Sequence, residues 1–226
     1  MKKVGSRSGK AGLLPGSLIH VGDALPTGTS LVEFVFSAEA YEERKLGSIS
    51  ELRETDPTKQ VSWLDIDGIN SERMLSAIGE RFNLHPLLLE DILNTDHRPK
   101  VEEYQDSLFL VAKMLELDKT TGGIQQEQVC FVLRHGQVIS FQERPGDVLD
   151  PIRERIRKDL GRVRRAGSDY LLYSLLDVIV DQYFVIVEDL GRRIEALEQK
   201  VLVQPGNADL HTIQELRGLL ITVNRY

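Results

Sequence analysis

The sequence contains one cysteine, no long apolar run and no secretion signal. Cys130 is the only cysteine among the 226 residues, so no intramolecular disulfide can form, and a reducing compartment is expected. No uninterrupted run of about 18 apolar residues occurs, and we therefore expect no segment that spans a bilayer. The first residues are basic but no apolar run follows them, which argues against a signal peptide.

Familiar catalytic and nucleotide-binding motifs are also absent. The five histidines are scattered and show neither HxxxH nor HExxH spacing. No GxSxG, Walker or dinucleotide-binding pattern occurs, because GSRSGK near the N-terminus is one residue too short for a phosphate loop. The net charge of −7 argues against general nucleic-acid binding and permits the binding of cations. We expect neither an enzyme nor a nucleic-acid-binding protein.

The chain divides into three segments by its patterning. Residues 1–11 are expected to be a flexible tail, residues 12–166 a domain of strands and helices, and residues 167–226 a helical hairpin. Alternating or branched residues predict strands over 18–21, 30–37, 60–66, 101–104, 107–117, 128–134 and 137–142. Caps and apolar stripes predict helices over 49–55, 71–82 and 148–160, and a short helix that opens at Pro86 and ends before Pro99. This order predicts a mixed sheet covered by helices.

The C-terminal segment predicts one unusually long helix, from Ser168 to about residue 203. At 1.5 Å per residue it would measure about 50 Å, more than the width of the preceding domain, so part of it must project. Its first half is apolar almost all round and is expected to be buried. Its second half narrows to a seam that 207–226 should complete as an antiparallel partner. The expected seam residues are Leu190, Ile194, Leu197, Val201, Leu210, Ile213, Leu216 and Leu220. The last residues carry no helix-stop signal, so we expect the natural protein to continue.

Acidic residues interrupt two apolar helices. Glu90 and Asp91 lie in HPLLLEDILNTDHRPK, between Pro86 and Pro99, and their side chains point about 100° apart, so each needs its own partner. Asp177 and Asp181 lie four residues apart in the long helix, where like charges repel unless a cation or a neighbouring subunit offsets the repulsion. The alternative for each is an ordinary solvated helix face, which also suits Glu188 and Glu195 further along the same stripe.

Three separated blocks resemble the cytoplasmic part of the CorA family of magnesium transport proteins. They are HPLLLEDILNTDHRPKVEEYQDSLFLVAKML, FQERPGDVLDPIRERIR and DYLLYSLLDVIVDQYF, within a collinear similarity from Gly12 to Tyr226. The resemblance implies an α/β/α sandwich around a mixed β-sheet, followed by long projecting antiparallel helices. It also implies homopentamers at the cytoplasmic face of the inner membrane, anchored by C-terminal helices that this chain lacks.

The resemblance further implies transport of Mg²⁺, often with Co²⁺ or Ni²⁺, controlled by regulatory cations between neighbouring cytoplasmic domains. Mg²⁺ would be the regulatory ion, with Co²⁺, Ni²⁺ or Ca²⁺ able to take its place. By position, Asp91 matches one interfacial site, whose main partner carboxylate would lie beyond Tyr226. Glu90 and Asp177 match a second site nearby. Mg²⁺ retains several waters and takes only one or two protein carboxylates, so the expected affinity is weak, as a sensor requires.

Three other functions remain open from the residues. A zinc transporter of the same superfamily would share the architecture, although the lack of clustered histidine and cysteine favours a hard cation. A soluble metal-dependent hydrolase would need a nucleophile, a base and metal ligands in one pocket, and no such set is visible. A purely structural helical-hairpin assembly domain would show no response to Mg²⁺.

Overall fold

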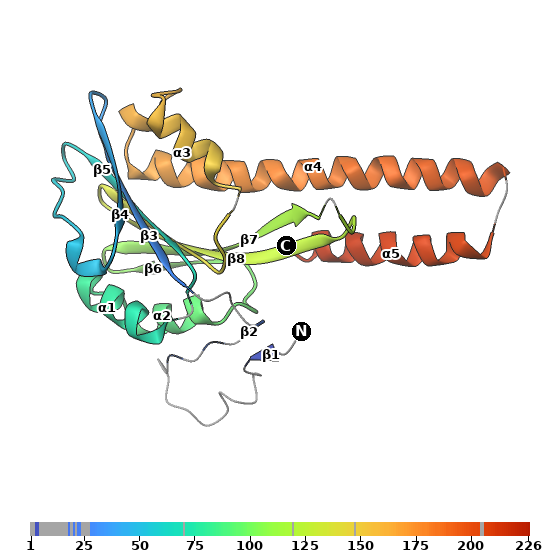
Figure 1. The fold of residues 1–226 in the computed structure, drawn as a ribbon, viewed down its shortest axis with the longest axis horizontal. Helices are drawn as coiled ribbons and strands as arrows, with labels where there is room; N and C mark the ends of the chain where they lie inside the picture. Colours follow the sequence, from blue (N-terminus) through green and yellow to red (C-terminus); the bar gives the residue numbers. More distant parts are fainter. Residues whose placement is uncertain are drawn as a thin grey trace.

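One mixed seven-stranded sheet organises the chain, in the order β4-β3-β5-β9-β8-β7-β6 (Figure 1). The computed structural model describes residues 3–4, 18, 20, 22–23, 28–69, 71–118, 120–146, 148–203 and 206–226. The strands of this sheet are β3 (Ser30–Phe36), β4 (Tyr41–Leu46), β5 (Val61–Asp67), β6 (Lys100–Tyr104), β7 (Ser107–Leu117), β8 (Ile124–Arg134) and β9 (Gln137–Gln142). Only β5 and β9 pair in parallel, and the other neighbours are antiparallel.

Helices cover both faces of this sheet, so the predicted α/β/α sandwich is confirmed. The helices are α1 (Glu72–Phe82), α2 (Pro86–Leu93), α3 (Asp150–Arg157), α4 (Ser168–Val203) and α5 (Asn207–Asn224), with short 3₁₀ turns at Ile49–Glu51 and Val163–Arg165. Leucines and isoleucines of α1 and α2 share one apolar core with Leu64 and Ile66 of β5. Residues of α3 and the first half of α4 share a second core with Phe34 and Trp63, on the opposite face.

Local signals explain most of the element ends. The Ser71 hydroxyl accepts a hydrogen bond from the Met74 N–H and starts α1, while Pro86 occupies the first turn of α2. The expected helix over 49–55 is wrong beyond Ile49–Glu51, because Ser48 makes no capping bond and the Glu51 carboxylate instead accepts from the Gly47 N–H. Strand β4 was not predicted. Its sequence YEERKL is charged because β4 is an edge strand, where charged side chains face water.

The long helix α4 has the predicted bounds and projects beyond the sheet beside α5 (Figure 1). The contact between the two helices differs from the predicted seam. Leu216 is buried and Leu219 and Val223 pack with it, whereas Leu210, Ile213 and Leu220 are largely exposed. The reason is that the C-terminal end of α5 also packs on the β7–β8 hairpin, through Leu115, Leu117 and Ile124, which rotates its contact face.

The first half of α4 is not buried on all sides, contrary to expectation. Its inner face packs on the sheet, but Tyr173, Val180, Phe184 and Val187 are half or more exposed. By length and composition alone α4 is apolar enough to cross a bilayer, although the sequence has no uninterrupted apolar run of that length. The contacts of Leu171, Leu175 and Ile179 with the sheet account for much of this apolar character, as in a core helix.

The N-terminal predictions fall mostly outside the described residues. Of the tail 1–11, only Lys3–Val4 is described, as strand β1 paired with β2 (Gly22–Asp23). Of the predicted strand 18–21, residues 18 and 20 are described and belong to no strand. The division of the chain into a domain of residues 12–166 and a helical hairpin of residues 167–226 stays a prediction. Because α4 begins at Ser168 and packs at once on the sheet, its first half shares the second core with the sheet.

Candidate ion-binding surfaces

Helix α2 positions Glu90 and Asp91 at the surface of the domain. Leu88, Leu89, Ile92 and Leu93 are buried towards the sheet, which leaves Glu90 and Asp91 half-buried on the other side. The helix starts with the His85 Nδ1 accepting a hydrogen bond from the Leu87 N–H at 3.2 Å. The apolar face therefore orients both carboxylates outwards, as the sequence predicts.

The cation that meets Asp91 comes from the same chain. Lys100 Nζ on β6 lies 2.7 Å from Asp91 Oδ2, and His97 Nε2 lies 2.8 Å from Asp91 Oδ1. Lys100 Nζ also lies 2.7 Å from Glu102 Oε1, and the Tyr104 hydroxyl donates to Glu102 Oε2. Asp91, His97, Lys100, Glu102 and Tyr104 thus form one polar chain, which we call the Asp91 cluster. Sequence reasoning missed Lys100 and His97, although both lie in the quoted block.

These contacts shift the pKa values of the two central groups. Partial burial raises the pKa of Asp91, but the hydrogen bonds from His97 and Lys100 outweigh burial and hold the pKa below its ordinary value. Burial likewise lowers the pKa of Lys100, and its bonds to Asp91 and Glu102 more than compensate, so its pKa is raised. Asp91 is therefore ionised and Lys100 protonated at neutral pH.

The loop after α2 is held to the sheet by buried polar side chains. The Gln128 Nε2 donates to the backbone oxygens of Asp91 (3.3 Å) and Asn94 (3.2 Å). The buried Lys113 Nζ donates to the Thr95 carbonyl at 2.5 Å and to Gln128 Oε1 at 3.2 Å. Burial lowers the pKa of Lys113. These bonds satisfy the carbonyls at the end of α2 and fix the position of Asp91.

Asp177 lies in a different environment, on the outer face of α4. It is half-buried and sits among Tyr173, Val180 and Phe184, which form an exposed apolar stripe with Val187. We call these four apolar residues the α4 outer stripe. Within the described ranges, no hydrogen bond or ion pair joins the Asp177 carboxylate to another side chain. Asp181, one turn further on, is exposed.

The structure does not bring the three predicted carboxylates together. Glu90 and Asp91 lie on the α2 face of the sheet, and Asp177 lies on the opposite, α4 face (Figure 1). Across the described part of the chain, no three side chains of histidine, cysteine, aspartate or glutamate converge as a metal-binding group would. The predicted donors are carboxylate oxygens, which suit a hydrated hard cation, but in the described part of one chain they lie apart.

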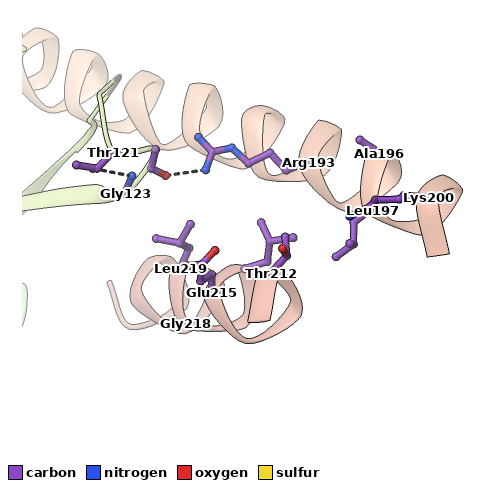
Figure 2. Close-up of a pocket in the computed structure, with 12 residues that line it drawn as sticks. Thr121, Gly123, Arg193, Ala196, Leu197, Lys200, Thr212, Glu215, Gly218 and Leu219 are labelled. Carbon is purple, nitrogen blue, oxygen red and sulfur yellow. Dashed lines mark hydrogen bonds between the residues drawn. The ribbon is translucent and has the colours of Figure 1, made fainter. Parts of the chain in front are cut away.

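A hollow of about 660 Å³ lies elsewhere, between the β7–β8 hairpin, α4 and α5 (Figure 2). Arg193 donates to the Gly122 carbonyl at 2.6 Å and also contacts Asp189, while Lys200 pairs with Asp209. The basic groups on its wall are therefore already neutralised. None of Glu90, Asp91 and Asp177 borders this hollow.

Comparison with known proteins gives one family. The family described as "CorA-like Mg2+ transporter protein" matches residues 58–226. The cobalt/magnesium transport protein CorA of Thermotoga maritima is 37% identical over 218 residues, which is 96% of this chain and 62% of that protein. This chain thus spans about three fifths of the length of that relative.

Solved structures share the fold at lower identity. The soluble domain of CorA from Methanocaldococcus jannaschii superposes with a TM-score of 0.65 at 19% identity, over 88% of this chain and 74% of that one. The ZntB cytoplasmic domain from Vibrio parahaemolyticus has a TM-score of 0.66 at 11% identity, over 88% and 75%. At such low sequence identities, both similarities show the fold alone.

Proposed function

Because this chain belongs to the CorA family, we propose that it is the ion-sensing cytoplasmic domain of a divalent-cation transporter. Its cargo is Mg²⁺, with Co²⁺ and Ni²⁺ also accepted, and its place is the cytoplasmic face of the cell membrane. The observation that carries this proposal is the 37% identity, over nearly the whole chain, to a cobalt/magnesium transport protein. The chain acts without catalysing a reaction.

The placement of the carboxylates supports sensing between copies of the chain. Glu90 and Asp177 lie on opposite faces of the sheet, so they can meet only across a contact between two copies. A contact that joins one face to a different face is heterologous, and such contacts close into rings when the rotation permits. This geometry is compatible with the homopentamer that the family resemblance implies. The α4 outer stripe supplies apolar area for the contact.

The electrostatics of the two faces would make such a ring sensitive to cations. A bound Mg²⁺ would supply two positive charges between the facing carboxylates of neighbouring copies. Without that charge, the Glu90 and Asp177 carboxylates repel each other and loosen the contact. The equilibrium between tight and loose rings is then coupled to the pore, and the pore closes when the contact is tight.

A zinc transporter of the same superfamily is the second candidate. The ZntB cytoplasmic domain shares the fold. Zinc sites take histidine or cysteine ligands, and within the described residues no group of three or more such donors forms. The oxygen donors of the two faces therefore favour Mg²⁺ over Zn²⁺.

Ion flux and Mg²⁺-dependent stability test the proposal together. We expect the intact protein in lipid vesicles to admit Mg²⁺, and its melting temperature to rise in millimolar Mg²⁺. Glu90→Gln combined with Asp177→Asn should remove most of that rise and make the opening of the pore independent of Mg²⁺, because neutral amides neither bind the cation nor repel each other.

The matched control is Glu195→Gln. Glu195 is an exposed carboxylate on the same side of α4 as Asp177. It should respond to Mg²⁺ like the parent. If the double variant also responds like the parent, the sensing role is wrong. If vesicles take up Zn²⁺ but not Mg²⁺, the assignment of the ion is wrong.

A further inference from the structure

In the Asp91 cluster, Lys100 contacts the carboxylate to which the family resemblance assigns a regulatory cation. We infer that Lys100 is a tethered competitor, which bridges Asp91 and Glu102 when divalent ion is scarce and keeps only Glu102 when the ion binds. This inference rests on the proposed function, because it concerns the second carboxylate site of the same ion-sensing domain.

Both oxygens of Asp91 are engaged in the isolated chain. Lys100 contacts Oδ2 at 2.7 Å and His97 contacts Oδ1 at 2.8 Å. The side chains of Asp91, His97 and Lys100 are 17%, 30% and 27% exposed, so solvent and ions reach the cluster. An ion that approaches Asp91 therefore meets a carboxylate whose charge is already balanced.

The charge of Lys100 opposes the binding of a second cation. A divalent ion on Asp91 would stand within a few ångströms of the ammonium group, where two like charges repel strongly even at high dielectric. Lys100 must therefore move away or the ion binds poorly. The cost of this displacement lowers the affinity below that of an unpaired carboxylate.

Glu102 offers Lys100 a second partner without a change in the backbone. Glu102 lies two residues further along β6, so both side chains project from the same side of the strand. Its Oε1 already contacts Lys100 Nζ at 2.7 Å, and its other oxygen accepts from the Tyr104 hydroxyl. When Lys100 leaves Asp91, its charge stays paired. The displacement thus gives up one of the two ion pairs of Lys100 and keeps the other.

Magnesium titration of the intact protein tests this inference, with calorimetry for the dissociation constant and thermal denaturation for stability. Lys100→Met keeps the aliphatic stem and removes the charge, so Mg²⁺ should bind about tenfold tighter. Without Mg²⁺ the same variant should melt earlier than the parent, because Asp91 loses its counter-charge. Glu102→Gln should weaken Mg²⁺ binding several-fold, since Lys100 then has no second carboxylate.

Two further variants separate the possible results. Lys45→Met removes an exposed lysine from β4, at the opposite edge of the sheet, and should leave the dissociation constant unchanged. Asp91→Asn, added to Lys100→Met, should abolish the tighter Mg²⁺ binding expected of Lys100→Met alone. If Asp91→Asn weakens Mg²⁺ binding but Lys100→Met leaves it unchanged or weaker, the competitor role is wrong while the proposed function stands. If Asp91→Asn leaves Mg²⁺ binding unchanged, Asp91 is not an ion site and the competitor role is wrong, and the sensing role is then decided by the Glu90→Gln and Asp177→Asn variant alone.

Discussion

Buried charges in this protein are either paired closely or shifted in pKa. Asp65 and Arg153 are nearly inaccessible, and the guanidinium donates two bonds to Asp65 Oδ2, at 3.0 Å from Nε and 2.6 Å from Nη2. Half-buried Glu127 on β8 forms no ion pair within the described residues, and its Oε1 accepts from the Arg144 backbone N–H at 2.9 Å. Burial, with the nearby Glu143 charge, raises the pKa of Glu127 to about 7.

This raised pKa makes stability depend on pH. Between its ordinary pKa of 4.5 and about 7, Glu127 binds more protons in the folded state than in the unfolded state. The free energy of unfolding therefore falls as pH rises through this range. We expect Glu127→Gln, which cannot ionise, to stabilise the protein at pH 8 by on the order of 2 kcal/mol and to have little effect at pH 4. Thermal denaturation at the two pH values measures this difference.

Glu103→Gln serves as the comparison, since Glu103 is exposed on β6. It should change the melting temperature equally at both pH values. An equal effect of Glu127→Gln at pH 4 and pH 8 would show that Glu127 ionises normally in the folded protein.

At the scale of elements, turn geometry determines where strands pair. The β8–β9 hairpin turns through His135 and Gly136, and Gly136 has a positive φ of 70°. A Cβ at this position would lie 2.4 Å from Pro57 Cβ and 2.6 Å from Pro57 Cα. Glycine is therefore required twice, for its backbone conformation and for the close approach of the segment before β5.

Gly136→Ala should destabilise the protein by about 2 to 4 kcal/mol, from the left-handed conformation and the overlap with Pro57 together. Gly146→Ala is the matched comparison, because Gly146 has a φ of 82° but no atom within 4 Å of its added Cβ. It should cost only the conformational part, about 1 to 2 kcal/mol. Urea denaturation gives both values. Equal losses in the two variants would mean that the contact with Pro57 relaxes freely.

At the scale of the whole molecule, the helices on the two faces of the sheet expose different kinds of side chain to solvent. The α2 face presents the Asp91 cluster, in which ion pairs are already formed. The α4 face presents the α4 outer stripe, with Phe184 64% exposed and Val180 51% exposed. Apolar side chains gathered on one helix face usually mark a contact surface. This surface is where we expect a neighbouring copy to pack.

Phe184→Ser should therefore weaken self-association of the intact protein without loss of fold. Removing one aromatic side chain from each contact should cost about 2 kcal/mol per contact, which shifts the mass distribution towards smaller species. Leu160→Ser changes a similarly exposed apolar residue outside the stripe and should leave the mass unchanged. Analytical ultracentrifugation distinguishes the two. A parent-like mass distribution for Phe184→Ser would show that the α4 outer stripe is not part of the contact between copies.

The success of sequence reasoning varied with the kind of signal. The bounds of α4, the 137–142 strand and the hairpin at His135-Gly136 follow from long periodicity or turn chemistry, and the structure confirms them. Strand β4 was missed because an edge strand with charged side chains lacks the apolar alternation of a half-buried strand. The α4–α5 contact was wrong in detail because the β7–β8 hairpin competes for the same helix faces.

Periodicity, caps and three family blocks determined the architecture, the family and the outward placement of Glu90 and Asp91, because these depend on local patterns within one element. Only the tertiary structure decided which partner each carboxylate has. Lys100 reaches Asp91 because β6 lies beside the end of α2, and Asp177 is separated from Glu90 because the sheet runs between their helices. An ion pair stabilises strongly only when its two charged groups lie within a few ångströms of each other. The packing of α2, β6 and the sheet sets those separations.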